Sequence, residues 1–171
     1  MPITPLHFGP SATLAFCLKK HLDLPIFVLA NVVIDFEPLM VMIFHPNYPL
    51  HGFCHTLIVG TLIGAMWGIF AFFARNFTKK FMRIFLINYQ TNLKLAVTSG
   101  MLGFYFHILL DSVMHSDIKP FYPSSYNPLY RIISVEDLYF LCAIFFIPAF
   151  VFYIIQAIRF RHNEKNGMPK T

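Results

Sequence analysis

Charged residues are scarce in this chain of 171 residues, since Asp, Glu, Lys and Arg together make up 12% of it. A soluble domain usually has about 25%. Apolar residues make up 57% and the mean hydropathy is +0.60, which excludes a disordered chain because disorder requires low hydrophobicity. A membrane-spanning helix takes about 20 residues, so at most four or five fit. The composition predicts one integral-membrane domain over residues 1–171.

Cysteine is also scarce, and the three cysteines, Cys17, Cys54 and Cys142, each lie within an apolar stretch. They form no Cys-x-x-Cys pair, which argues against a zinc knuckle and a disulfide framework. We expect them to be small buried hydrophobic side chains. The first residues lack the positive start and the small-residue cleavage site of a secretory signal peptide, so we expect no cleaved signal.

Four long apolar segments predict four spanning helices, and a shorter segment precedes them. The short segment, residues 11–18, cannot cross about 30 Å of hydrocarbon at 1.5 Å per residue and predicts an N-terminal half-span helix or an interfacial helix. Gly60, Gly64 and Gly68 recur at every fourth position, which favours close helix packing in lipid. We therefore expect an all-α, polytopic membrane helical bundle. Its long segments cover residues 24–44, 53–74, 93–115 and 138–158.

The basic residues predict a topology. They cluster between apolar segments instead of covering one face, which argues against a nucleic-acid partner despite the formal charge of +5. Eleven of the 13 lie at alternate segment ends, and only Lys119 and Arg131 lie in the other loops. The positive-inside rule then places the 75–94 loop and the C-terminus in the cytoplasm, and the 45–52 and 116–137 loops outside.

Ionisable side chains interrupt several of these apolar segments. Each costs at least about 2.5–3.5 kcal/mol inside a membrane, so it indicates a functional site. Asp35 and His107 are expected about 12–14 Å below the outer surface, at 1.5 Å per residue. The predicted topology brings seven such groups to the outer half of the membrane: His7, Asp35, His51, His55, His107, Asp111 and His115.

The spacing of these groups is typical of metal ligands on a helix. His107, Asp111 and His115 recur at every fourth position and form one stripe, and His51 and His55 have the same spacing. Imidazole and carboxylate at this spacing can chelate a divalent ion, most simply zinc, with manganese as the alternative. Seven groups are too many for one tetrahedral zinc with an open position. Either two ions bind, or one binds and the remaining groups support it.

Asp35 and Glu37 are the candidate general bases. They lie about 160° apart on a regular helix, so Glu37 shares the site only if Pro38 distorts the backbone. For Asp117 we expect a solvated charge or a helix cap. A purely structural network of hydrogen-bonded histidines and carboxylates is the competing interpretation. Five residues are left open as members of the site: Glu37, Cys54, Asp117, Lys119 and Arg131.

With these motifs the chain resembles the YdjM-like family of inner-membrane proteins, which are predicted metal-dependent hydrolases of the LexA-regulated type. The resemblance rests on residues 4–9, 31–38, 51–56 and 103–111, which carry an N-terminal His, Asp-x-Glu, a His-rich element before Thr, and His-x-x-x-Asp. Many members have an arginine between the paired histidines, and this chain lacks it. The resemblance implies a metal-dependent hydrolase in a prokaryotic cytoplasmic membrane, but it does not imply a substrate.

We expect a membrane-embedded metallohydrolase whose site opens to the outer leaflet. Headgroup depth favours a membrane lipid or another phosphoester as substrate, and the His/Asp set is similar to zinc-dependent phospholipase C by analogy alone. Lys119 and Arg131 are the cations that could hold a phosphate. The alternatives are a metal ion or proton transporter, a haem-binding membrane protein with paired axial histidines, and a non-catalytic scaffold with a structural zinc. The oligomeric state is left open.

Overall fold

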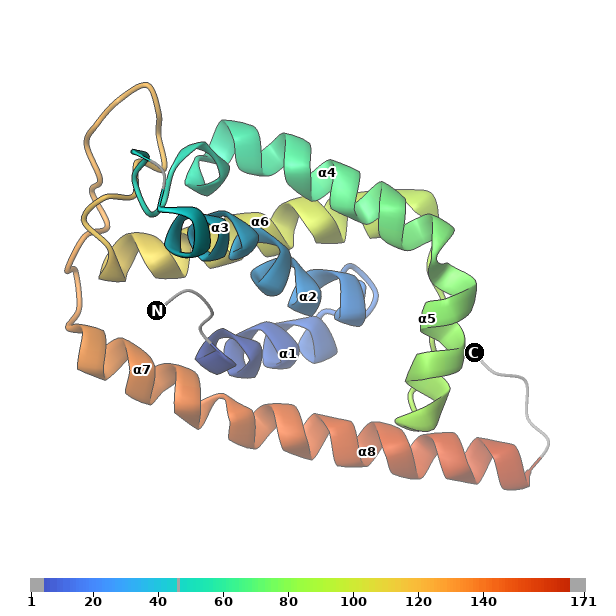
Figure 1. Ribbon diagram of the computed structural model, residues 1–171. Coiled ribbons are helices and arrows are strands. Elements are labelled where there is room, and N and C mark those ends of the chain that lie inside the picture. The colour runs from blue at the N-terminus through green and yellow to red at the C-terminus, as the bar shows by residue number, and fades with distance from the viewer. Residues whose placement is uncertain (1–4, 46, 167–171) are drawn as a thin grey trace.

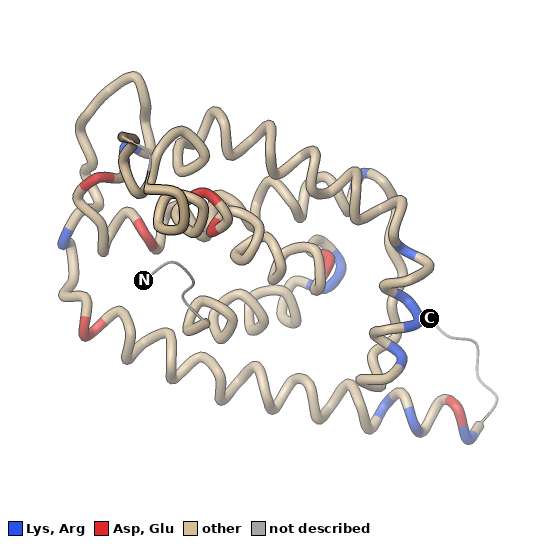
Figure 2. Tube along the Cα trace, viewed as in Figure 1, with Lys and Arg blue, Asp and Glu red and all other residues tan. Residues whose placement is uncertain are grey.

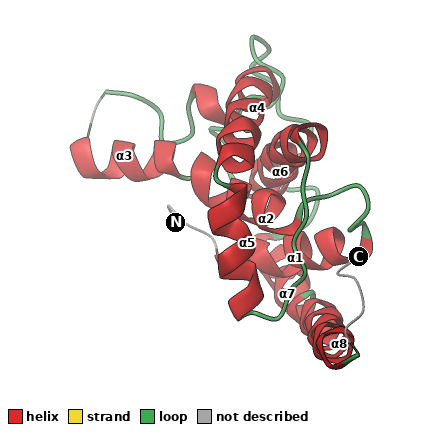
Figure 3. Ribbon diagram, turned by 90° about the vertical axis from the view of Figure 1, so that its right-hand side faces the viewer, coloured by secondary structure: helices red, strands yellow, loops and turns green. Residues whose placement is uncertain are grey.

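The computed structural model describes residues 5–45 and 47–166, and all regular structure in these ranges is helical (Figures 1 and 3). The expected all-α class is confirmed for this part of the chain. Two short 3-10 helices are η1 (Pro5–His7) and η2 (Phe53–His55). The α-helices are α1 (Phe8–Cys17), α2 (Leu24–Ile34), α3 (Phe36–Phe44), α4 (Leu57–Phe73), α5 (Arg75–Ile84), α6 (Leu93–Met114), α7 (Val135–Ile144) and α8 (Phe146–Lys165).

Three helical stretches are long and apolar enough to span a membrane: Leu24–Phe44, Leu93–Met114 and Val135–Lys165. The pair α4 and α5 also passes this test, but it is bent by 76° at its junction. The described residues therefore contain three candidate spans, or four if the bent pair is one span. This agrees with a helical membrane bundle, while the exact number of spans stays a prediction.

The bundle has α6 near its centre, between α4 on one side and the continuous rod of α7 and α8 on the other (Figure 1). The glycines of α4 allow it to approach α6 closely. A Cβ added to Gly64 would lie 2.8 Å from the Cα of Met101, and one added to Gly68 would lie 2.5 Å from the carbonyl oxygen of Ala96. The close packing predicted from the glycine repeat is confirmed.

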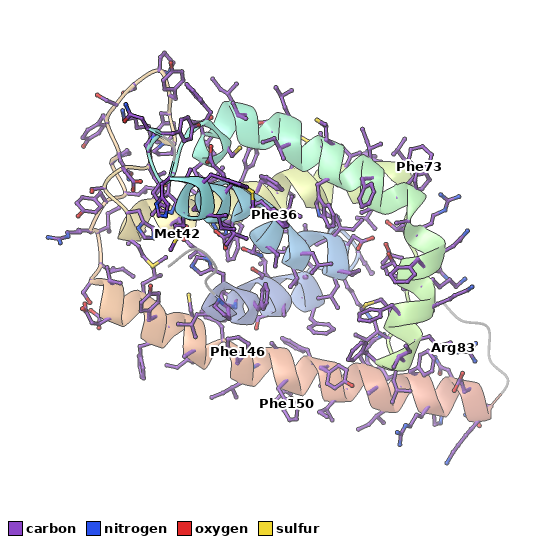
Figure 4. The ribbon with its side chains drawn as sticks, viewed as in Figure 1. Phe36, Met42, Phe73, Arg83, Phe146 and Phe150 are labelled. Carbon is purple, nitrogen blue, oxygen red and sulfur yellow. The ribbon has the colours of Figure 1, made fainter. Side chains whose placement is uncertain are left out.

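The outward surface of the helices is apolar. Figure 4 shows Phe73 at the end of α4 and Phe150 of α8 projecting from the bundle, where their exposed fractions are 73% and 64%. Such a surface suits hydrocarbon and not water. The chain is thus a membrane protein by the length, apolar composition and outward face of its helices.

The predicted segment 24–44 is broken at Asp35. This residue ends α2 and begins α3, and α3 then projects away from the bundle (Figure 3). Pro38 explains the break, because a proline ring cannot accommodate a helical carbonyl four residues earlier, here that of Ile34. The sequence predicted that Glu37 could share the site only if Pro38 distorted the backbone, and the backbone is distorted at this point.

Charge is divided between the two ends of the bundle (Figure 2). Lys and Arg residues of α5, of the α1–α2 link and of the C-terminal part of α8 gather at one end. The described carboxylates lie mostly at the other end, where α3, the end of α6 and the loop before α7 meet. The asymmetry agrees with the pattern of the basic residues, while the orientation in a membrane stays a prediction.

Candidate metal centre

The centre is built around His107 and Asp111 of α6, which lie one turn apart and are both buried. His107 Nε2 is 3.1 Å from Asp111 Oδ2 and 3.3 Å from Asp35 Oδ1. The break between α2 and α3 places Asp35 here, at the end of one helix and beside the second half of another. Two carboxylates thus converge on one imidazole from different segments.

His55 completes this group from η2. Its ring centroid is 5.7 Å from that of His107, and its Nδ1 donates a 2.8 Å hydrogen bond to Glu37 Oε2. The ligand atoms of four buried residues all lie within 4.8 Å of one another. These residues, called the inner group below, are Asp35, His55, His107 and Asp111.

Several polar atoms at the inner group have no hydrogen-bond partner among the described residues. Nδ1 of His7, Nδ1 of His107 and Nε2 of His55 are buried without a hydrogen bond or an ion pair to the described residues. Nε2 of His7, Nε2 of His107 and Oδ1 of Asp111 also lack a regular hydrogen bond, but they take part in the ion-pair contacts of 3.1–3.5 Å within the cluster. Leaving such an atom unpaired costs about 1–3 kcal/mol, and folded proteins have few of them. Buried imidazole and carboxylate atoms that converge in this way can act as the ligands of a divalent cation. The donor set therefore fits a metal ion.

His7 lies at the edge of the inner group. Its Nε2 is 3.5 Å from Asp111 Oδ1, and its ring centroid is 5.1 Å from that of His107. The start of α1 is held in place from the neighbouring helix, because Ser11 donates to the His7 carbonyl and Asn31 donates to the Ser11 hydroxyl. His7 is thus held beside His107 and Asp111 of α6, the residues with which the sequence predicted it to converge.

A second set of ligand atoms adjoins the first. His51, His115 and Asp117, called the outer group below, also lie within 4.8 Å of one another. The ring centroids of His51 and His115 are 4.3 Å apart, and those of His51 and His55 are 4.8 Å apart. The two groups therefore form one continuous cluster that contains six of the seven predicted candidate ligands, and the seventh, His7, lies at its edge.

The imidazoles of the outer group favour the neutral form that binds metal. Burial lowers the pKa of His51, and the neighbouring His55 lowers it further. Burial also lowers the pKa of His115. Neutral imidazole is the ligating form, so these groups need little proton release on binding.

Asp117, which the sequence left open as a member of the site, joins the outer group, while its side chain keeps an exposed fraction of 37%. Its carboxylate accepts hydrogen bonds from both the backbone N–H and the ring Nδ1 of His51, at 3.1 and 3.0 Å. Burial alone raises the pKa of Asp117, but these bonds with His51 outweigh it and the pKa falls. The one sequence signal was its position two residues after His115.

The helical spacing argument holds for part of the cluster only. His107 and Asp111 lie on α6 as predicted, but His115 caps the helix with extended backbone and turns toward His51. His51 and His55 are not on an α-helix, because Thr56 caps α4 and the helix begins at Leu57. Their rings are neighbours because the loop and η2 bring them together. The prediction that they lie one turn apart on an α-helix is therefore wrong.

Glu37 holds that loop in place. Its carboxylate accepts hydrogen bonds from the backbone N–H groups of Gly52 and Cys54 and from the Tyr48 hydroxyl, in addition to His55. Burial and the nearby Glu37 carboxylate raise the pKa of the Cys54 thiol to about 12. The thiol is therefore a weak nucleophile at neutral pH, and Cys54 belongs to neither group of ligand atoms.

A cavity of about 290 Å³ opens beside the outer group. His51 and Asp117 line one side, and Lys119 lines another. Its remaining walls include aromatic rings, of which Phe53 and Tyr122 pack edge to face at 5.3 Å. The guanidinium of Arg131 lies over the ring of its neighbour Tyr130. Of the two expected phosphate-binding cations, Lys119 is therefore the one that lines this cavity.

Comparison of the chain with protein-family models, with curated proteins and with solved structures finds no match. The resemblance to the YdjM-like family therefore stays a prediction. The findings on function come from the geometry of the cluster alone: a buried His/Asp group within apolar helices that could hold a metal ion.

Proposed function

We propose that the chain is a membrane-embedded metal-dependent hydrolase acting on a lipid or another phosphoester, as its resemblance to the YdjM-like family implies. The observation that carries the proposal is the inner group, whose buried imidazole and carboxylate atoms converge within 4.8 Å of one another inside an apolar bundle. The prokaryotic inner membrane and an outward-facing site belong to the same proposal.

The ligand set favours zinc, with manganese as the alternative. His55, His107 and Asp111 would hold the first ion and leave one position for water, with Asp35 beside them, and the outer group would hold a second ion or support the first. A bound divalent cation supplies Lewis-acid polarisation of a phosphoryl oxygen and lowers the pKa of a water molecule. Glu37 would fix the orientation of His55, as carboxylates that accept from the second ring nitrogen of a ligating histidine do.

The remaining groups of the cluster have roles that follow from their contacts. The Asp35 carboxylate is the group we assign as general base, because it belongs to the inner group while Glu37 is engaged by four donors. His7 would stabilise Asp111 at the edge of the group. Lys119 would attract the anionic part of a substrate into the cavity beside His51.

The position of the cluster favours hydrolysis over transport. A core of buried apolar side chains begins one turn before His107 on α6 and includes Phe104, Ile108, Ala30 and Ile34. An ion leaving the cluster toward the basic end of the bundle would pass these four side chains, which carry no ligand atoms. A site open at one end suits a reactant that enters and leaves on the same side.

Metal analysis of the purified protein tests the proposal. We expect stoichiometric zinc or manganese in the wild type, and loss of the metal in both Asp111→Ala and His55→Ala. His162→Ala, which removes an exposed histidine at the end of α8, is the matched control. Size-exclusion chromatography and circular dichroism show whether each variant folds. Retained metal in both cluster variants would overturn the metal assignment.

Turnover separates a hydrolase from a metal-binding scaffold. The metal-loaded protein is incubated with bis(p-nitrophenyl) phosphate and with dihexanoyl phosphatidic acid, and product is measured before and after chelation. We expect hydrolysis that chelation abolishes and Asp35→Asn strongly reduces. Metal binding without hydrolysis of either compound would favour the non-catalytic role.

A further inference from the structure

A second polar site lies at the basic end of the bundle, remote from the metal centre. It is a cavity of about 240 Å³ formed by the α1–α2 link, the link before α6, the start of α6 and α8. Leu95, which lines it, precedes Asp111 by 16 residues on α6, so the two sites are about 24 Å apart along that helix. The cavity therefore needs an explanation of its own.

Two buried polar side chains line this cavity. Asp23 is 3% exposed and Tyr89 is 6% exposed. The carboxylate is fixed, because Oδ1 accepts the Ile26 N–H at 3.3 Å and the Asp23 N–H donates to Ser99 Oγ at 2.7 Å. Asp23 Oδ2 and Tyr89 Oη make no hydrogen bond of regular geometry with the described residues, although they lie close enough to each other and to the Thr91 hydroxyl to interact. Such groups favour a ligand that brings a positively charged hydrogen-bond donor.

The electrostatic surroundings of the two side chains agree with this view of the cavity. Burial raises the pKa of Asp23, although the nearby hydroxyls of Thr91 and Tyr89 partly offset it. Burial and the Asp23 carboxylate raise the pKa of Tyr89. A cationic group placed between the two oxygens would remove the penalty on the charged carboxylate.

The rim of the cavity has the opposite charge. Lys19 and Lys20 line it and are exposed. An adjoining cavity of about 220 Å³ shares Lys19 and adds Arg159 of α8. Three cations around one buried carboxylate suit a ligand with a phosphate outside and an amine inside.

An apolar groove of about 400 Å³ continues from the polar cavity. Phe16, Leu24 and Pro25 line both. The groove then runs between α2 and α5, where Val28 and Phe81 are among its walls. Polar and apolar cavities that share a wall match an amphiphile, with its headgroup in the first and its chain in the second.

We propose that this pair of cavities binds one phospholipid of the ethanolamine class. The ammonium contacts Asp23 and Tyr89, the phosphate contacts Lys19 and Lys20, and one acyl chain occupies the groove between α2 and α5. The inference does not depend on the metal centre or on hydrolysis.

Native mass spectrometry of the detergent-purified protein tests the proposal. Palmitoyl-oleoyl phosphatidylethanolamine, phosphatidylcholine and phosphatidylglycerol, which share the same chains, are titrated separately. We expect the ethanolamine lipid to bind at least about 10-fold more tightly than the choline lipid, which has no N–H donor, with the glycerol lipid between them. A 10-fold ratio of affinities corresponds to about 1.4 kcal/mol, which we assign to the contact between the lipid amine and the Asp23 carboxylate.

Asp23→Asn is the decisive variant. Asparagine is as good a helix cap as aspartate, so α2 keeps its start while the charge is lost. We expect the preference for ethanolamine over choline to disappear in Asp23→Asn and to weaken in Tyr89→Phe. Lys19→Ala with Lys20→Ala should weaken binding of all three lipids, whereas the equally charged double variant Lys79→Ala with Lys80→Ala on the exposed side of α5 should not.

Two results would overturn the proposal. One is equal binding of the ethanolamine and choline lipids by the wild type, and the other is an unchanged preference in Asp23→Asn. Free phosphoethanolamine is a further arm of the experiment. If it binds as tightly as the lipid, the groove contributes nothing and a soluble ligand replaces the lipid. Metal content, measured in the same samples, keeps this result separate from the fate of the metal centre.

Discussion

Glu37 and His55, 18 residues apart, are joined by a 2.8 Å hydrogen bond between Oε2 and Nδ1. One residue lies in the first turn of α3 and the other just before α4, so the bond links two elements that have no regular helix between them. It leaves Nε2 of His55 free to face His107 and Asp111. The orientation of a candidate ligand thus depends on a carboxylate outside the inner group.

Replacing Glu37 by Gln should weaken metal binding without removing it. The amide keeps an acceptor for the backbone N–H groups but loses the charge that stabilises the ring of His55. We expect affinity for zinc to fall by about 10–100-fold, as is typical for such supporting carboxylates. Competition with a chromophoric chelator measures it. Glu164→Gln, on exposed α8, serves as the control, and an unchanged affinity in Glu37→Gln would show that Glu37 does not orient the ligand.

Gly68→Ala should destabilise the bundle. The added methyl group would lie 2.5 Å from the carbonyl oxygen of Ala96, so α4 must move away from α6, at a cost of about 1–3 kcal/mol. Thermal unfolding in detergent should show a clearly lower midpoint. Met66→Ala, at a position 67% exposed on the same helix, should change it little. Equal midpoints for Gly68→Ala and the wild type would mean that the helices are not in close contact.

Asp23→Asn should change the pH dependence of stability. The folded-state pKa of Asp23 is raised by burial, so between its unfolded and folded pKa values the folded state holds more protons and stability falls as pH rises. Below about pH 3.8 the unfolded carboxyl is protonated too, and the penalty vanishes. In lipid-free detergent the variant should therefore be more stable than the wild type at pH 7 and equal to it near pH 4. A gain in unfolding temperature that does not vary with pH would contradict this explanation.

The predicted topology can be tested by thiol labelling. After the three native cysteines are replaced by alanine, single cysteines are introduced at Tyr126 and Lys79, both exposed. A membrane-impermeant maleimide applied to intact cells should label Tyr126→Cys and should label Lys79→Cys only after lysis. The reverse pattern would place the metal centre at the cytoplasmic side and contradict the positive-inside prediction.

Hydrophobic runs and charge placement were enough to predict the helical bundle and the convergence of the candidate ligands. Burial of His107 and Asp111 follows from their place in an apolar helix, where an ionisable group needs partners. The relationship of His51 to His55 could not be derived in this way, because Thr56 delays the start of α4 and a loop positions both rings. Loop paths depend on contacts made far along the chain, here those of Glu37 and Asp117.

The break at Asp35 shows a related limit. Pro38 indicates a distortion, yet its direction is set by the partners that Glu37 finds, and these come from residues 48–55. Similarly, Asp117 joins the cluster through both the backbone and the ring of His51. A local pattern shows which groups are costly to bury, and only the tertiary structure shows which neighbour relieves the cost.

The 76° bend between α4 and α5 has a mechanical consequence. A helix that bears Arg75, Lys79, Lys80 and Arg83 alongside exposed Phe77 and Phe81 is suited to lie flat at the boundary between headgroups and hydrocarbon. Its far end is tied to α8 by the ion pair between Arg83 and Glu164. Moving such a helix into the hydrocarbon would bury its charged side chains, so the helix fixes the depth of the protein in the bilayer. A change in bilayer thickness would then change the distance between the metal centre and the surface of the opposite leaflet. The distances among the ligand side chains would stay the same.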